Sequence, residues 1–123
     1  MTERGKAMKA KMVRQGDVLL IATTETGDEP EKKDPRGVVL AEGETSGHYH
    51  AVFGRGAKLM RFRDTARQER VLVVGKGGAE VRVVGGGAGG VDRHTPIRLE
   101  HGRYLQRVQR AWTSENYSRQ VED

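Results

Sequence analysis

The fold class is decided by the stretch Arg70-Val71-Leu72-Val73-Val74-Gly75-Lys76-Gly77-Gly78-Ala79-Glu80-Val81-Arg82-Val83-Val84. It contains two runs rich in valine, and β-branched residues of this kind favour extended strands. Three glycines within four residues separate the runs, which is typical of a turn between strands. The stretch therefore predicts a β-hairpin, with strands at 70–74 and 80–84 and a turn at 75–78.

Short apolar runs separated by turn residues continue on both sides of this stretch. The chain has 17 glycines and only 3 prolines, and this punctuation favours strands over long helices. A second hairpin is predicted from 38–41 and 48–53. Further strands are expected at 17–22, 58–63, 97–99 and 103–112. About seven or eight short strands are typical of an all-β chain, here a small single-domain β-barrel or sandwich.

The chain is long enough for one domain with a modest core, since it has 123 residues, 35% of them hydrophobic. The pattern predicts a flexible basic arm at 1–12, a β domain at 13–112 and a polar tail at 113–123. No apolar run approaches the ~20 residues of a membrane span, and the N-terminus lacks an apolar leader segment. We therefore expect no membrane partner and a cytoplasmic protein, or a virion protein if the chain is a phage structural component.

The charge of the chain is positive and unevenly distributed. The formal net charge is +5, and much of the excess lies in the N-terminal arm and in the predicted strand at 103–112. Such basic patches attract polyanions. Nucleic-acid binding is therefore one hypothesis, and it would use the basic residues Lys6, Lys9, Lys11, Arg14, Arg103, Arg107 and Arg110.

Histidines provide the most specific chemical signal. His48 and His50 are two residues apart on a predicted strand, so their imidazoles project from one face. A third histidine, His94, lies in the segment Arg93-His94-Thr95-Pro96-Ile97. Three imidazoles with an open coordination position can bind a divalent metal such as zinc, manganese, iron or nickel. A fourth ligand or a supporting group is expected among Glu42, Glu44 and His101.

Alternation along the predicted strand 48–53 assigns its two faces. Tyr49, Ala51 and Phe53 are apolar or aromatic, so we expect this set to face the core. The histidines would then line the mouth of a barrel or the outer surface. A plainer interpretation also stays open, in which the two histidines occupy a half-exposed strand face and His94 bonds a turn carbonyl.

The segment from Val39 to Ala51, with Gly43-Glu44-Thr45-Ser46-Gly47-His48-Tyr49-His50 at its centre, resembles an uncharacterised family of small bacterial and bacteriophage proteins. That family continues with a His-x-Pro-Ile segment, here His94-Thr95-Pro96-Ile97, and a Gly-x-Tyr segment, here Gly102-Arg103-Tyr104. The His-x-His pair also resembles the first motif of the cupins, which implies that a cupin-like barrel is one form of the predicted fold. The chain departs from the cupin pattern, because Ala51 to Arg55 contains no carboxylate and His94 precedes Pro96.

These observations support three hypotheses of different classes. In the first, a β domain binds a divalent metal or a small ligand in a pocket lined by His48, His50 and His94. In the second, the chain is a structural or accessory protein of a phage or mobile element, and it forms a homo-oligomer or a larger assembly. The third is nucleic-acid binding through the basic arm. The sequence leaves open whether the protein is an enzyme.

Overall fold

The computed structural model describes residues 11–43, 47–85 and 95–108, and these residues form strands and turns without a helix. The prediction of an all-β chain is confirmed, and the form is a sandwich of two antiparallel sheets rather than a closed barrel. The strands are β1 (Met12–Gln15), β2 (Val18–Ala22), β3 (Glu29–Pro30), β4 (Val38–Glu42), β5 (His48–Phe53), β6 (Lys58–Arg61), β7 (Arg70–Val74), β8 (Ala79–Gly85), β9 (Ile97–Leu99) and β10 (Gly102–Val108).

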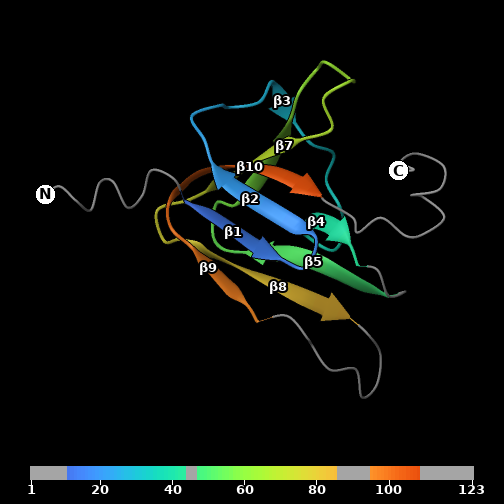
Figure 1. The fold of residues 1–123 in the computed structure, drawn as a ribbon, viewed down its shortest axis with the longest axis vertical. Coiled ribbons are helices and arrows are strands. Elements are labelled where there is room, and N and C mark those ends of the chain that lie inside the picture. Colours follow the sequence, from blue (N-terminus) through green and yellow to red (C-terminus); the bar gives the residue numbers. More distant parts are fainter. Residues whose placement is uncertain (1–10, 44–46, 86–94, 109–123) are drawn as a thin grey trace, which may run out of the picture.

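The larger sheet has six strands in the order β1-β2-β10-β7-β6-β3, and the smaller sheet has four in the order β4-β5-β8-β9. Figure 1 shows how the two sheets are arranged. The predicted hairpin of β4 and β5 is confirmed, with Val38 opposite Val52 and Glu42 opposite Tyr49. None of the described residues forms a helix long and apolar enough to cross a membrane.

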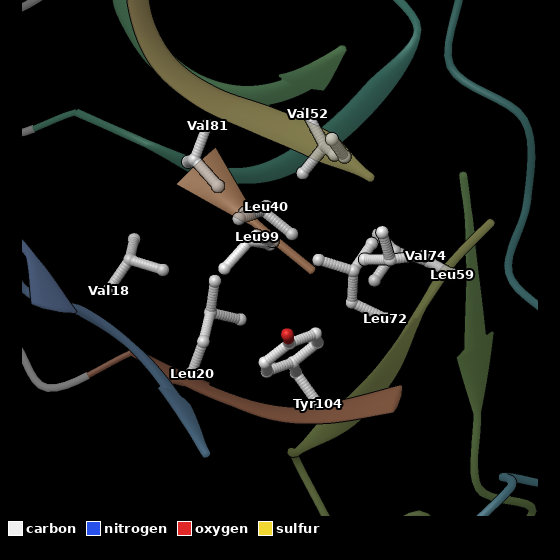
Figure 2. Packing of buried hydrophobic residues seen from close by; sticks show 11 residues of the cluster. Val18, Leu20, Leu40, Val52, Leu59, Leu72, Val74, Val81, Leu99 and Tyr104 are labelled. Carbon is white, nitrogen blue, oxygen red and sulfur yellow. The ribbon is translucent and has the colours of Figure 1, made fainter. Parts of the chain in front are cut away.

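The core lies between the two sheets and contains one cluster of aliphatic side chains with a single tyrosine (Figure 2). Strands of both sheets contribute, because alternate residues of each strand point to the same face. The buried cluster consists of Val18, Leu20, Leu40, Val52, Leu59, Leu72, Val74, Ala79, Val81, Leu99 and Tyr104. Burial raises the pKa of the Tyr104 phenol, whose hydroxyl donates to the Glu100 carbonyl at 2.9 Å.

The prediction of a hairpin at 70–84 is wrong in its pairing, although both strands form. β7 lies between β10 and β6 in the larger sheet, whereas β8 lies between β5 and β9 in the smaller one. The glycine-rich segment 75–78 therefore carries the chain from one sheet to the other. Two strands that both have a strong apolar face bury more surface across the core than beside one another. The turn residues alone do not show whether the two strands pair in one sheet or lie in opposite sheets.

Glycines are needed where two of the connections between the sheets pack against each other. A Cβ atom on Gly54, which follows β5, would lie 2.7 Å from the Gly78 carbonyl oxygen, and one on Gly75 would lie 2.7 Å from that of Arg55. Both distances are shorter than any real contact of a Cβ atom. The connections β5–β6 and β7–β8 can therefore pack backbone against backbone only because these positions have no side chain.

A β-bulge in β4 frees a backbone carbonyl that forms hydrogen bonds to the other sheet. Val39 pairs with Ala51 and Ala41 with His50, so Leu40 has no partner in this register. The Leu40 carbonyl instead accepts hydrogen bonds from Arg70 at 2.6 Å and from Gln106 at 3.0 Å. Both donors belong to the larger sheet. The backbone group released by the bulge is thus satisfied across the core.

The first strand was not predicted. β1 begins at Met12, within the segment expected to be an arm, and Met12 pairs with Ile21 of β2. Residues 1–10 and 109–123 lie outside the described residues, and so do most of the predicted arm and all of the predicted tail. The last predicted strand is described up to Val108.

Gly78 and Gly77 provide a matched test of the crossing between the sheets. Gly78 has a φ of +80°, and a Cβ there would lie 2.8 Å from the Leu99 carbonyl oxygen, while one on Gly77 would meet nothing within 4 Å. We expect Gly78→Ala to lower the free energy of unfolding by about 1–3 kcal/mol and Gly77→Ala to change it by less than about 0.5 kcal/mol. Urea denaturation measures both, and equal stability of the two variants would contradict this account of the crossing.

Candidate functional site

The histidine face of β5 points toward the core, which corrects the predicted orientation. His50 is only 3% exposed, and Val52 on the same face belongs to the core cluster. Phe53 is 42% exposed instead. The aromatic rings on the outer face are covered by arginines, with Arg36 4.6 Å from the Tyr49 ring centre and Arg82 5.0 Å from that of Phe53. Cation–π contacts make this face favourable without burial in the core.

Gln15 holds His50 in place. Its side-chain Oε1 lies 3.0 Å from His50 Nδ1, and its Nε2 donates to the carbonyls of Val81 at 3.0 Å and Thr95 at 3.1 Å. Gln15 is 4% exposed and ends β1 of the larger sheet, whereas Val81 and His50 belong to the smaller sheet. This one amide therefore joins the two sheets and orients the imidazole.

Asp17 completes a buried polar cluster around His50. Gln15 and Asp17 flank Gly16 in the turn between β1 and β2, where Gly16 has a φ of 60°. The Asp17 carboxylate is 9% exposed, and its Oδ1 lies 4.0 Å from His50 Nε2. A two-residue turn thus brings an amide and a carboxylate to the two ring nitrogens of one histidine.

His48 begins β5 on the same face as His50 and is half-buried. Its Nδ1 atom is buried and has no hydrogen-bond partner in the described structure. Buried polar atoms are nearly always paired in native proteins, so an unpaired one needs an explanation. His48 therefore stands out as a group that a ligand would satisfy.

His94 lies outside the described residues, so the predicted set of three histidines is not seen together. The next residue, Thr95, is described, and its carbonyl accepts from the same Gln15 amide that contacts His50. Within 11–43, 47–85 and 95–108, no three His, Asp or Glu side chains gather closely enough to hold a metal ion. In the described part, Gln15 and Asp17 lie against His50, and no third His, Asp or Glu of these residues completes a metal-binding cluster with them.

The three candidates for additional ligands are placed differently. Glu42 pairs with Tyr49 on the outer face and lies 2.7 Å from Arg36, so it points away from His50. Glu44 is outside the described residues. His101 is exposed in the turn before β10. Because Val108, at the far end of β10, pairs with Val18 next to Asp17, His101 is about 20 Å of strand away from that turn.

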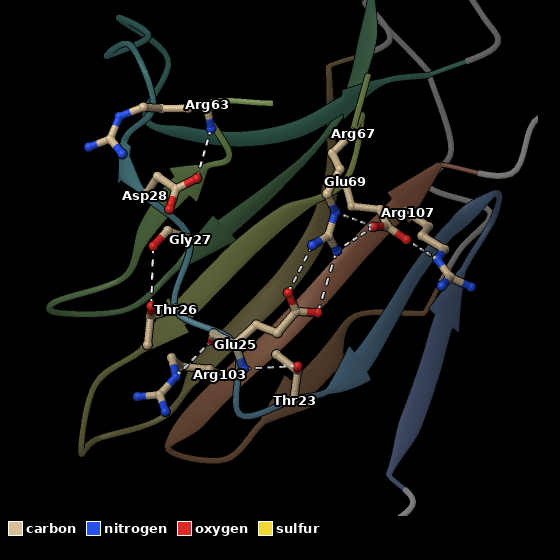
Figure 3. A network of polar contacts seen from close by, with 10 residues as sticks. All are labelled: Thr23, Glu25, Thr26, Gly27, Asp28, Arg63, Arg67, Glu69, Arg103 and Arg107. Carbon is tan, nitrogen blue, oxygen red and sulfur yellow. Dashed lines mark hydrogen bonds and ion pairs between the residues drawn. The ribbon is translucent and has the colours of Figure 1, made fainter. Parts of the chain in front are cut away.

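Three of the basic residues singled out from the sequence have acidic or carbonyl partners: Lys11, Arg103 and Arg107. Arg107 lies 2.6 Å from Glu69, and Arg103 donates to the Glu25 carbonyl at 3.0 Å (Figure 3). Arg103 also donates to the Thr24 carbonyl at 3.2 Å. Lys11 lies 3.8 Å from Glu100. Arg14 is exposed on β1, while Lys6, Lys9 and Arg110 lie outside the described residues. Arg103 and Arg107 therefore serve first to tie loops to the outer face of the larger sheet.

The electrostatics of this outer face come from a chain of ion pairs. Arg67 bridges Glu25 at 2.9 Å and Glu69 at 2.7 Å, and Arg107 contacts Glu69 from the other side (Figure 3). Hydrogen bonds from Arg67 and then Arg107 hold the pKa of Glu69 below its ordinary value. Arg36 similarly lowers the pKa of Asp34 through its side-chain and backbone hydrogen bonds.

Comparison with known protein families identifies the family of this chain. A family model described as "Domain of unknown function (DUF8820)" matches residues 14–109. The chain belongs to the DUF8820 family. The matched segment contains Gln15, Asp17, His48, His50 and His94. No curated protein and no solved structure matches the chain, and nothing in these comparisons links it to the cupins.

The sequence interpretation missed Gln15 and Asp17. A signal was present, because Gln15-Gly16-Asp17 stands directly before the apolar strand 18–22, and a glycine between two polar residues is typical of a tight turn. Which way these side chains point depends on the pairing of β1 with β2. Since β1 was not predicted, neither was their contact with His50.

Loss of the Gln15 amide should destabilise the DUF8820 domain. In Gln15→Leu, His50 Nδ1 and two carbonyls lose a hydrogen bond in the interior, so we expect the free energy of unfolding to fall by about 2–4 kcal/mol. Gln68, which is exposed, provides the control, and Gln68→Leu should change it by less than about 0.5 kcal/mol. Chemical denaturation followed by circular dichroism compares the two, and a stable Gln15→Leu variant would show that the amide is dispensable.

The Glu69 network predicts a pH dependence of stability. The folded-state pKa of Glu69 lies below the ordinary value of about 4.3, so its contribution is present above that pH and is lost as the pH falls through the lowered pKa. We expect Glu69→Gln to be about 0.5–1 kcal/mol less stable than wild type at pH 7, with the gap closing below about pH 4. Glu100, whose side chain is 70% exposed, is the control position, and an equal effect of Glu100→Gln would refute the network.

Proposed function

We propose that the DUF8820 domain binds a divalent metal ion or a small ligand through His48, His50 and His94. The observation that carries this proposal is the Gln15 amide, which contacts both His50 and the carbonyl of Thr95, the residue next to His94. Segments 45 residues apart in the sequence therefore meet at one glutamine. The two histidines of β5 share the face on which this meeting occurs.

The unpaired nitrogen of His48 supports the same proposal. Leaving a buried polar atom without a partner costs about 1–3 kcal/mol, and a bound metal ion or ligand donor would remove that cost. Imidazole nitrogens suit zinc, iron and nickel, and manganese accepts them together with carboxylates. The proposal concerns binding, and it leaves open whether the bound group takes part in a reaction.

A structural role in an assembly is the second candidate function. The observation in its favour is β1, which is an end strand of the larger sheet among the described residues and whose Met12 is 58% exposed although it is a large apolar residue. An unpaired strand edge with an apolar side chain is suited to contact with another chain. In that case the histidines would serve only the fold, and the protein would bind no metal. For nucleic-acid binding the support is weaker, since Arg103 and Arg107 already have partners.

Calorimetric titration with zinc, nickel and manganese tests the proposed site. We expect wild type to bind one ion, and we expect His48→Ala and His94→Ala each to weaken binding by about 100-fold, or roughly 2.7 kcal/mol. His48→Ala is the most informative variant because its Nδ1 makes no hydrogen bond whose loss would disturb the fold.

His101→Ala is the matched control, because His101 lies at the opposite end of β10 and should not affect the affinity. Thermal unfolding of each variant confirms that it is folded. The proposal fails if wild type binds none of these ions and no small ligand shifts its melting temperature. It also fails if the His48 and His94 variants bind as tightly as wild type.

A further inference from the structure

We propose that one end of the sandwich binds single-stranded nucleic acid, with phosphates on Arg55 and Lys76 and a base on the ring of Phe53. This inference is independent of the proposed function, because Phe53 is the last residue of β5 whereas His48 is its first. We call this surface the basic end, and it consists of residues 54–58, 75–78 and 98–103 together with the neighbouring ring of Phe53.

Strand pairing brings three connections together at the basic end. β7 ends beside the start of β10, with Val74 opposite Gly102, and β8 begins beside the end of β9. The β5–β6 and β7–β8 connections pack against each other, since a Cβ atom on Gly75 would lie 2.7 Å from the Arg55 carbonyl oxygen. In Figure 1 the β7–β8 and β9–β10 connections lie together on the left. Residues far apart in the sequence therefore share this end.

Positive charge is concentrated at the basic end. Residues 54–58, 75–78 and 98–103 contain five cations and one carboxylate, so five minus one leaves a surplus of four positive charges. The five cations are exposed, and they are Arg55, Lys58, Lys76, Arg98 and Arg103. The carboxylate is that of Glu100, and its ion-pair partner is Lys11 at 3.8 Å. Since the formal net charge of the whole chain is +5, this small region has a surplus of similar size.

The charges of the basic end are not compensated within the described part of the chain. Its carboxylates pair instead with other arginines, among them Arg36, Arg61, Arg67, Arg70, Arg82 and Arg107. Of the described residues, Arg55, Lys58 and Lys76 take part in no ion pair. Arg98 and Arg103 bond to backbone carbonyl oxygens. Like charges gathered in this way repel one another, whereas a polyanion is attracted to them.

Phe53 favours a single strand over other polyanions. This residue directly precedes Gly54 and is 42% exposed, with Arg82 over its ring at 5.0 Å from the ring centre. Proteins that bind single strands without sequence preference combine positive charge with aromatic side chains on which bases stack. The bases of a duplex are stacked on one another, and a lipid headgroup has no base. An exposed ring beside uncompensated cations therefore fits an unpaired base next to its phosphates.

The glycines of the two turns leave room for a long anionic chain. In residues 54–57 and 75–78, Arg55 and Lys76 are the only side chains larger than a methyl group. Gly77 is exposed, and a Cβ atom there would meet nothing within 4 Å. A phosphate backbone can therefore reach both cations without displacing another side chain of these turns.

Fluorescence anisotropy of a labelled oligothymidylate, titrated with the whole chain over a series of salt concentrations, tests the basic end. We expect wild type to bind. The double variant Arg55→Gln/Lys76→Gln should reduce the slope of log K against log salt by about 1.4, or about 0.7 for each lost phosphate contact. Phe53→Leu should weaken binding about 10-fold and leave the slope unchanged, because it removes a stacking surface and no charge. Phe53→Tyr keeps the ring and should retain the affinity.

Matched controls come from the loop that follows β6, at the end of this strand opposite Lys58. Arg63 is exposed, and its backbone N–H donates to the Asp28 carboxylate at 2.9 Å (Figure 3). Phe62 is half-buried, with Arg67 3.8 Å from its ring centre. Arg63→Gln and Phe62→Leu should therefore bind the oligonucleotide as wild type does. Thermal unfolding confirms that each variant is folded.

Contrary results overturn defined parts of this inference. If wild type binds no oligothymidylate at low salt, or if Arg55→Gln/Lys76→Gln keeps the wild-type slope, the basic end is not the site. If a duplex of the same length binds as tightly, or Phe53→Leu keeps the wild-type affinity, the assignment to single strands is wrong. Binding to phosphatidylserine vesicles without binding to oligothymidylate would identify a membrane surface as the partner instead. His48→Ala should bind the oligonucleotide as wild type does, so a failure of the metal site leaves this inference standing.

Discussion

Polar groups that are buried between two sheets must find hydrogen-bond partners across the core, and this constraint organises the sandwich. The β-bulge at Leu40 turns a backbone carbonyl toward the larger sheet, where Arg70 and Gln106 donate to it. The Gln15 amide does the same for the carbonyl of Val81. Each tie fixes the smaller sheet against the larger one. The apolar cluster between them supplies most of the burial, and these bonds select one register.

The same ties position the histidines. His50 is on β5, whose neighbours β4 and β8 carry the carbonyls of Leu40 and Val81 that accept bonds from the larger sheet. The imidazole thus sits on the most firmly tied part of the smaller sheet. His48 lies one pleat further toward the start of β5.

The sequence predicts the elements of this fold better than their pairing. Valine-rich runs and glycine turns locate the strands well, since they depend on local conformation. They do not show that the 75–78 segment crosses between sheets, because a turn residue has the same conformation in a hairpin and in a crossing. Similarly, the His-x-His spacing correctly places His48 and His50 on one face of the strand. The aromatic side chains of Tyr49 and Phe53, however, wrongly predict that the opposite face points to the core. Arginines from elsewhere in the chain cover those rings, and no local pattern predicts them.

His48 and His50 lie on the same strand, yet the buried Nδ1 of His48 has no hydrogen-bond partner in the described structure, whereas that of His50 has one. A domain of this size has about 5–15 kcal/mol of net stability, so a cost of about 1–3 kcal/mol for one buried, unsatisfied atom is a substantial share. His50 on the same strand shows that the fold can satisfy a buried imidazole, because Gln15 does so. A ligand that bonded to His48 Nδ1 would remove this cost. Such a ligand at 100 times its Kd would add about 2.7 kcal/mol to the stability of the folded state, which is as large as the cost that His48 imposes. The stability of the domain and the occupancy of the site would then be linked through this one nitrogen.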